Sequence, residues 1–272
     1  MVRSLDITCE GMWILQGLLG IGQLPINLAL LPYITAGGTD AATTHPGVQT
    51  LRDAGVLSGA DEIHPDVEHW LRMLGHPEIE LAIRVDGPVK MRASIVRSGA
   101  EQVAAVRVGD DLCVYPLPAM TSFSEVAECA QSILPAAEPA VTTPVAMPAR
   151  ALETVISAMI ADPETTPRRH LERAGVKAEQ ATLLADAVDS PTRETSFVLV
   201  TYADGEPDVH PVGAAVTDTE NGRLVMGPLA GSGDGEDWIQ IQSGTTAKIV
   251  EAVCGVETQM PPRTRWFSPR LL

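Results

Sequence analysis

The chain has 272 residues, 45% of them hydrophobic and only 4% aromatic, and its formal net charge is −16. Such an acidic surface repels phosphate backbones and anionic lipids, so it excludes nucleic acid and membrane surfaces as expected partners. The hydrophobic share excludes a disordered chain and predicts a core built mainly from aliphatic side chains.

The first predicted element is a helix near the amino terminus, with Met12, Leu15 and Leu19 on one face. Residues 11–39 carry no charge, a pattern that also occurs in signal peptides and membrane spans. Acidic residues stand where a signal peptide is positive, and glycines and prolines interrupt the apolar run: Asp6, Glu10, Gly20, Gly22, Pro25 and Pro32. We therefore expect a soluble, cytoplasmic protein.

The hexapeptide LRDAGV at residues 51–56 precedes a predicted helix that begins at Pro65. Alternating polar and apolar residues then predict an antiparallel meander of four strands, at residues 80–85, 91–97, 102–108 and 111–117. A helix follows at residues 122–134, where Ser122 and Glu125 match a capping box.

A second hexapeptide, LERAGV at residues 171–176, is followed by the same order of elements. A helix precedes it, and the stretch after it predicts a helix at 181–188, strands at 195–202, 212–218, 223–227 and 237–242, and a helix at 245–256. The repeated order predicts an internal duplication that forms a pseudo-twofold α+β protein. The expected organisation is a first repeat at 1–134, a stiff, extended proline-rich connector at 135–149 and a second repeat at 150–272, within one compact domain.

No catalytic, cofactor-binding or metal-binding residues are predicted. His64, His69 and His76 are spaced five and seven residues apart, which does not place them on one helical face, and helix-boundary roles are favoured. The four cysteines never form a CxxC pair, so we expect buried free thiols: Cys9, Cys113, Cys129 and Cys254.

Two apolar features leave alternatives open. In the strand at 195–202, Val198, Val200 and Tyr202 project from one side while Phe197 and Leu199 project from the other. Either helices cover both faces, or one face meets a partner, and we favour the partner. In the basic tail Arg263–Leu272, Trp266 and Phe267 are either interface anchors or side chains that fold back onto the core.

Several stretches of the first half resemble the EspG proteins: DITCEGMWILQGLLGIGQLP, HPGVQTLRDAGVL, HPDVEHWLRMLGHPEIELAIRV and SGAEQVAAVRVGDDLCVYPL. The second half follows the same pattern, with NGRLVMGP before IQSGTTAKIVEAV. The resemblance implies a central antiparallel sheet flanked by helical bundles. It also implies a cytosolic chaperone of type VII (ESX) secretion, with no cofactor, that binds the helical tip of a PPE protein within a PE–PPE heterodimer. It would keep this client soluble and direct it to its secretion system.

The resemblance also implies which residues contact the client. In the family the contact draws on the loop between the first two strands, the first strand of the second half and the carboxy-terminal helical bundle. Carried over to this chain, these are Asp86, Gly87, Pro88, Val89 and Lys90 in the loop, Ser196, Val198, Val200 and Tyr202 in the strand, and Leu183, Asp186, Ala187, Lys248 and Glu251 on helices. The loop is short here, whereas some members carry a long insertion, so its share of the contact and the choice of client are expected to differ.

An alternative function is an enzyme or small-ligand binder that uses a cavity between the duplicated halves. The sequence leaves open which ESX system and client the protein serves, and whether the free protein forms a homodimer.

Overall fold

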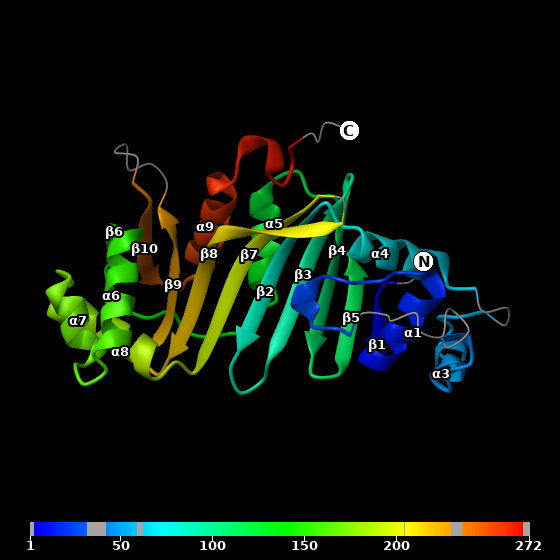
Figure 1. Cartoon of the computed structure of the whole chain (residues 1–272), viewed down its shortest axis with the longest axis horizontal. Helices are drawn as coiled ribbons and strands as arrows, with labels where there is room; N and C mark the ends of the chain where they lie inside the picture. The colour runs from blue at the N-terminus through cyan, green and yellow to red at the C-terminus, as the bar shows by residue number, and fades with distance from the viewer. Residues whose placement is uncertain (1–2, 32–41, 59–61, 204, 230–235, 269–272) are drawn as a thin grey trace. The chain divides into compact units, whose positions relative to one another are not determined.

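The computed structural model describes residues 3–31, 42–58, 62–203, 205–229 and 236–268 (Figure 1). The strands are β1 (Leu5–Thr8), β2 (Ile79–Asp86), β3 (Met91–Ser98), β4 (Glu101–Val108), β5 (Asp111–Pro116), β6 (Val145–Pro148), β7 (Arg193–Ala203), β8 (Glu206–Thr219), β9 (Gly222–Leu229) and β10 (Trp238–Ser243). The helices are α1 (Cys9–Leu19), α3 (Gly47–Asp53), α4 (Pro65–Gly75), α5 (Phe123–Ser132), α6 (Ala149–Ala161), α7 (Pro167–Arg173), α8 (Ala178–Asp189) and α9 (Thr246–Gln259), with 3-10 turns η1 (Ile26–Leu28) and η2 (Pro262–Thr264).

The strands follow the hydrogen-bonded order β1-β5-β4-β3-β2-β7-β8-β9-β10-β6. The fold class is therefore the predicted one, an α+β protein with an antiparallel sheet and helices. The chain divides into two compact units, and the strands β2, β7 and β8 each contribute residues to both. Unit 1 consists of residues 1–84, 89–120 and 199–209, and unit 2 consists of residues 85–88, 121–198 and 210–272.

Unit 1 has its main apolar core where helices α1, α3 and α4 meet the sheet. On α4, Pro65 occupies the first turn, and the Nδ1 atom of His64 accepts a hydrogen bond of 3.2 Å from the backbone N–H of Asp66. Trp70, Leu71 and Leu74 of this helix are buried in one cluster with strand residues that include Val96, Val103, Ala105, Leu112 and Val114. These apolar side chains form the face of the helix that packs in the core.

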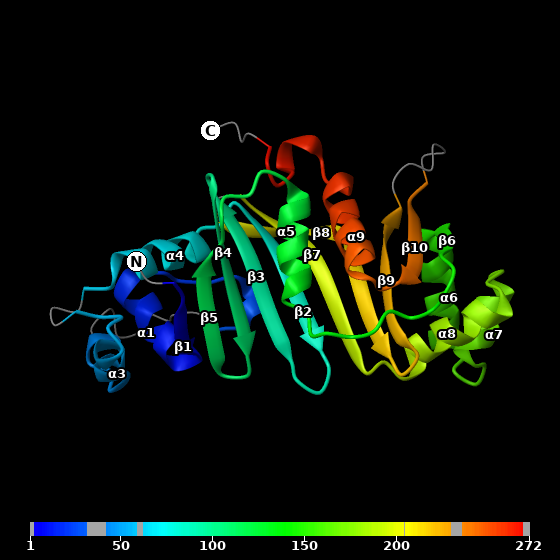
Figure 2. The ribbon, with the colours of Figure 1, turned by 180° about the vertical axis from the view of Figure 1, so that it is seen from behind.

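Unit 2 carries helices on both faces of its sheet. Figure 2 shows α5 and α9 on one face, where Ala252 of α9 lies against Gly227 of β9. Helices α6, α7 and α8 contribute to a second cluster, in which Leu184 and Ala185 of α8 are buried with Leu224 and Ile241 of the strands. Since Leu224 and Gly227 have opposite parity along β9, α8 and α9 cover opposite faces of this sheet.

The two matching hexapeptides adopt the same local structure. Each forms the end of a short helix, α3 or α7, followed by a glycine at positive φ, 71° at Gly55 and 90° at Gly175. The following valine N–H then returns to the leucine carbonyl that opens the hexapeptide, at 2.9 Å in the first copy and 3.1 Å in the second. This hydrogen-bonded ending requires glycine where φ is positive. The order of elements agrees in both halves, while the duplication itself and the predicted domain boundaries stay predictions.

Two sequence expectations need correction, and one open alternative is decided. Residues 145–148 of the proline-rich connector form the strand β6, which pairs with β10. All four cysteines are free, as expected, but each is only half-buried. Trp266 is fully buried and packs on Phe123, with ring centroids 5.5 Å apart, so this residue folds back instead of anchoring a partner. Asp204, between the predicted strands at 195–202 and 212–218, and residues 269–272 of the tail lie outside the described residues.

Among the helices in the described part of the chain, none has the length and apolar character needed to cross a membrane.

Candidate functional site

The predicted loop Asp86–Lys90 has an anchored half and an exposed half. Pro88, Val89 and Lys90 are exposed, Val89 to 62%. Asp86 and Gly87 are half-buried, and a Cβ atom at Gly87 would lie 3.2 Å from Cγ of Arg193 and 3.3 Å from the carbonyl oxygen of Thr192. The loop therefore lies directly on the start of β7, with the glycine at the point of closest approach.

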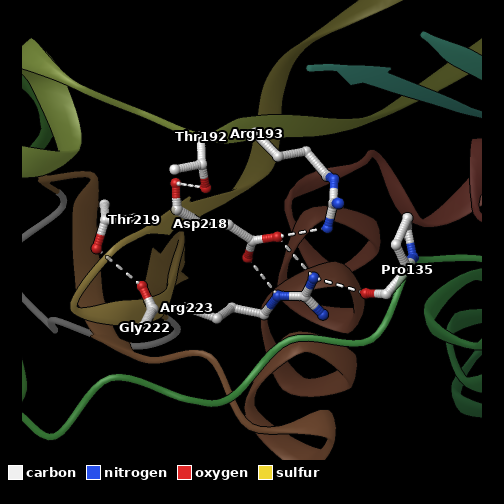
Figure 3. Close-up of polar contacts among 7 residues, drawn as sticks. All are labelled: Pro135, Thr192, Arg193, Asp218, Thr219, Gly222 and Arg223. Carbon is white, nitrogen blue, oxygen red and sulfur yellow. Dashed lines mark hydrogen bonds and ion pairs between the residues drawn. The ribbon is translucent and has the colours of Figure 1, made fainter. Parts of the chain in front are cut away.

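A buried ion-pair network holds the start of β7 in unit 2 (Figure 3). The Asp218 carboxylate of β8 accepts two hydrogen bonds from Arg223 of β9, at 2.6 Å from Nε and 2.9 Å from Nη2. It accepts a third, of 2.9 Å, from Nη1 of Arg193. The Asp218 and Arg223 side chains are only 8% and 4% exposed. Bidentate pairs of this kind fix orientation as well as charge.

Backbone contacts extend this network to the connector and to β7. Nη2 of Arg223 also donates 2.7 Å to the carbonyl of Pro135, and its backbone N–H donates 2.7 Å to the carbonyl of Glu138. The N–H and hydroxyl of Thr192 both donate to the carbonyl of Asp218, at 2.8 and 3.0 Å. The loop, the connector and three strands of unit 2 thus meet at one fixed point.

The strand β7 presents different faces to the two sides of the sheet in unit 2. Arg193 reaches Asp218 on the face that α9 covers, and Phe197, four residues on, is fully buried. Ser196 and Val198 point to the opposite face, which is the α8 face, and both are half-buried. These two predicted contact residues are therefore partly open to solvent.

On α8, the predicted contact residues lie close to exposed apolar surface. Leu183 and Ala187 are half-buried and pack against the α6–α8 core. Asp186 accepts a hydrogen bond of 2.8 Å from Nδ2 of Asn221 in the β8–β9 turn. Val188 is 54% exposed. This helix is tied to the sheet and still offers apolar atoms to a partner.

The predicted residues on α9 are not brought together with those on α8. Lys248 and Glu251 form an exposed ion pair of 2.6 Å on a helix that covers the opposite face of the unit 2 sheet. Glu251 lines a groove of about 350 Å³ together with Gln240, Gln242 and Cys254. Burial raises the pKa of the Cys254 thiol, so the reactive thiolate is disfavoured there.

The last two predicted strand residues, Val200 and Tyr202, belong to unit 1 and are less available than expected. Val200 is only 7% exposed, so the expectation that it offers an open face is wrong for the free chain. The Tyr202 hydroxyl donates 2.5 Å to Oε2 of Glu80, and Oε1 of Glu80 accepts 2.5 Å from the Ser94 hydroxyl. The Tyr202 hydroxyl, which was expected to meet a partner, is therefore bound within the chain by Glu80 of β2, and Glu80 is bound in turn by Ser94 of β3.

The buried Glu80 has an unusual electrostatic setting. Burial raises the pKa of its carboxyl above the usual range, and the hydrogen bonds from Ser94 and Tyr202 oppose part of that rise. Burial and the neighbouring Glu80 carboxyl also raise the pKa of Tyr202.

Within the described residues, no group of three histidine, cysteine, aspartate or glutamate side chains is placed to hold a metal ion.

Sequence reasoning missed the network of Arg193, Asp218 and Arg223. One signal could have found part of it: Asp218 and Arg223 stand on either side of the turn signal Asn221-Gly222 and face each other in the β8–β9 register. Opposite charges at facing positions of a hairpin form cross-strand pairs. The third member, Arg193, lies too far away in sequence for any local pattern to show it.

The chain is similar to known proteins over nearly its whole length. The EspG family model matches residues 8–255. The chain is 25% identical to the ESX-5 secretion-associated protein EspG5 of Mycobacterium marinum, over 95% of this chain and 94% of that protein. It is 27% identical to the ESX-2 secretion-associated protein EspG2 of Mycobacterium tuberculosis, over 98% and 99%. A solved structure of the type VII secretion system chaperone EspG5 of Mycobacterium tuberculosis, in complex with a PE25-PPE41 dimer, has the same fold, with a TM-score of 0.78, 20% identity and coverage of 95% and 97%.

Proposed function

The chain belongs to the EspG family, and on that premise we propose that it is a type VII secretion chaperone that binds a PPE protein within a PE–PPE heterodimer. Binding keeps the client soluble in the cytoplasm and directs it to an ESX secretion system. The observation that carries the proposal is the family match over residues 8–255, in a chain whose fold is that of a chaperone solved with a PE25-PPE41 dimer.

The α8 face of unit 2 is the contact surface that the geometry supports best. It presents Ser196 and Val198 of β7, both half-buried, and the exposed apolar side chain of Val188 on α8. A reversible client contact needs apolar area that stays accessible in the free chaperone, and these side chains provide it. The exposed tip of the loop, Val89 and Lys90, keeps its predicted share of the client contact in this proposal.

Co-purification with candidate PE–PPE pairs tests the function. We expect one pair to co-elute with the wild-type chain in stoichiometric amounts. Val188→Arg should weaken that complex at least tenfold, because an unpaired charge would be buried against the client. Val141→Arg is the matched control, since Val141 is a fully exposed valine in the connector of the same unit. Lys90→Glu should weaken binding less than Val188→Arg, because rim charges mainly tune the encounter rate.

Two results would contradict the proposal. If the wild-type chain captures none of the PE–PPE pairs encoded beside ESX systems, PE–PPE proteins are not its clients. A metabolite that raises the melting temperature by several degrees, while no PE–PPE pair does so, would favour the small-ligand binder instead.

A further inference from the structure

At Gly87, the exposed loop between β2 and β3 lies against the aliphatic stem of Arg193 and the carbonyl of Thr192. At Gly87, the atoms nearest to the position of an added Cβ are Cγ of Arg193 at 3.2 Å, the Thr192 carbonyl oxygen at 3.3 Å and Cβ of Arg193 at 3.4 Å. Two of the three belong to the aliphatic part of Arg193. The path of Asp86–Pro88 therefore depends on where that stem lies.

The stem of Arg193 is fixed from its far end. An arginine side chain that is 25% exposed has many rotamers in isolation, but Nη1 of Arg193 is held 2.9 Å from Oδ2 of Asp218. Asp218 is itself fixed by both arms of Arg223, which the carbonyl of Pro135 holds in turn. Figure 3 shows these side chains converging from β7, β8, β9 and the connector.

We propose that Arg193 is a positioning residue for client binding: pinned by Asp218, its stem holds the loop at Asp86–Pro88 in the conformation that meets the PE–PPE client. This inference rests on the proposed function. Ordering a loop at the moment of binding costs affinity, and a loop that is ordered beforehand avoids that cost. The close approach of Gly87 to Arg193 contributes to that ordering in the free chain.

A series of substitutions at Arg193 separates the effect of its ion pair with Asp218 from the effect of its aliphatic stem, which lies against Gly87. Arg193→Ala removes both, Arg193→Met keeps a stem without the charge, and Arg193→Lys keeps a stem with a cation that can reach Asp218. Arg168→Ala is the matched control, because Arg168 is an exposed arginine paired with an acid at 2.8 Å in the same unit. Each variant is measured for PE–PPE affinity and, without client, for hydrogen exchange of the amides of residues 86–90.

We expect Arg193→Ala to bind the client about tenfold more weakly, Arg193→Met to fall in between and Arg193→Lys to return close to wild type. Loop amides should exchange faster in the Ala and Met variants and at the wild-type rate in the Lys variant and the Arg168→Ala control. A general loss of stability would instead raise exchange across the whole of unit 2. Gly87→Ala adds a methyl group against Arg193, so it should also weaken client binding and speed the exchange of the loop amides.

The outcomes distinguish this inference from the proposed function. If the wild-type chain binds no PE–PPE pair, the proposed function fails and client positioning by Arg193 fails with it, whatever the exchange data show. If the wild type binds a pair but Arg193→Ala binds within twofold of it, or if loop exchange is the same in all variants, the positioning role is overturned while the chaperone stands.

Discussion

Removing the carboxylate of Asp218 should be among the most damaging single changes in unit 2. Asp218→Ala deletes three charge-assisted hydrogen bonds, two from Arg223 and one from Arg193. The Arg223 guanidinium then stays in a site where its side chain is only 4% exposed. Among the described residues, the Pro135 carbonyl is the acceptor that its side chain keeps. A buried charge that loses its counter-ion has no water to replace it.

The cost follows from that geometry. Breaking a buried ion pair by removing one partner costs roughly 3–5 kcal/mol, whereas breaking an exposed pair costs about 0–1 kcal/mol. The Asp218 side chain is 8% exposed, which places it in the first class. Urea unfolding at neutral pH, followed by circular dichroism, should show a loss of about 3–5 kcal/mol for Asp218→Ala.

The exposed pair of Arg168 and Glu172 provides the control, since Glu172→Ala breaks an ion pair of 2.8 Å on the surface of α7. That variant should lose less than about 1 kcal/mol. A double variant, Asp218→Leu with Arg223→Met, should recover much of the stability, because replacing both charges removes the unpaired guanidinium. The reasoning would be refuted by an Asp218→Ala protein that loses less than about 1 kcal/mol, or by a double variant that is weaker still.

The remaining predictions concern four other positions. The folded-state pKa of Glu80 is raised, so stability should fall as pH rises from near the ordinary carboxyl value of 4.5, and urea titrations across that range should show no such fall in Glu80→Gln. Gly175→Ala should lower stability by about 1–2 kcal/mol, measured by thermal unfolding, because φ is 90° there. His64→Ala should lose about 0.5–1 kcal/mol with the α4 cap and leave PE–PPE affinity within a few-fold. Val200→Arg should unfold the protein, seen as loss of soluble yield, because Val200 is buried.

Three of these predictions have a control variant in the chain. For Gly175→Ala the control is Gly22→Ala, which should be neutral because no neighbouring atom lies within 4 Å of an added Cβ and φ is not positive. For His64→Ala the control is the exposed His69→Ala, which should also be neutral. Val141→Arg should stay soluble. A folded Val200→Arg that binds no client would contradict the burial argument and restore the strand as the contact surface.

Local patterns predicted the elements that local forces decide. The turns after α3 and α7 were visible because both hexapeptides place a glycine where φ must be positive. The capping box of Ser122 and Glu125 at the start of α5 is confirmed, with both reciprocal hydrogen bonds present. Extended segments of five or more residues also marked eight strands, from β2 to β5 and from β7 to β10.

Two strands were missed because nothing local specifies them. β1 and β6 have four residues each, and β6 follows Pro144 and ends at Pro148, in a stretch whose composition favours an extended connector. Each pairs along a strand far away in sequence, β1 with β5 and β6 with β10. A strand this short forms at the end of a sheet because the neighbouring strand has unpaired backbone N–H and C=O groups. The residues of the short segment itself carry no sign of that neighbour.

The partner-binding surface could be predicted only as far as alternation reaches. Alternation predicts Val198, Val200 and Tyr202 on one side of β7. It could not show that the Tyr202 hydroxyl is hydrogen-bonded to Glu80 of the neighbouring strand β2. Nor could it show that α8 and α9, both assigned to the contact by resemblance, cover opposite faces of one sheet. A client that touches the α8 face of unit 2 meets Val198 and Val188 without meeting Lys248. Charge reversal at Lys248 is therefore the change that separates a one-faced contact from one that wraps around the sheet: the α8-face proposal expects no loss of PE–PPE affinity.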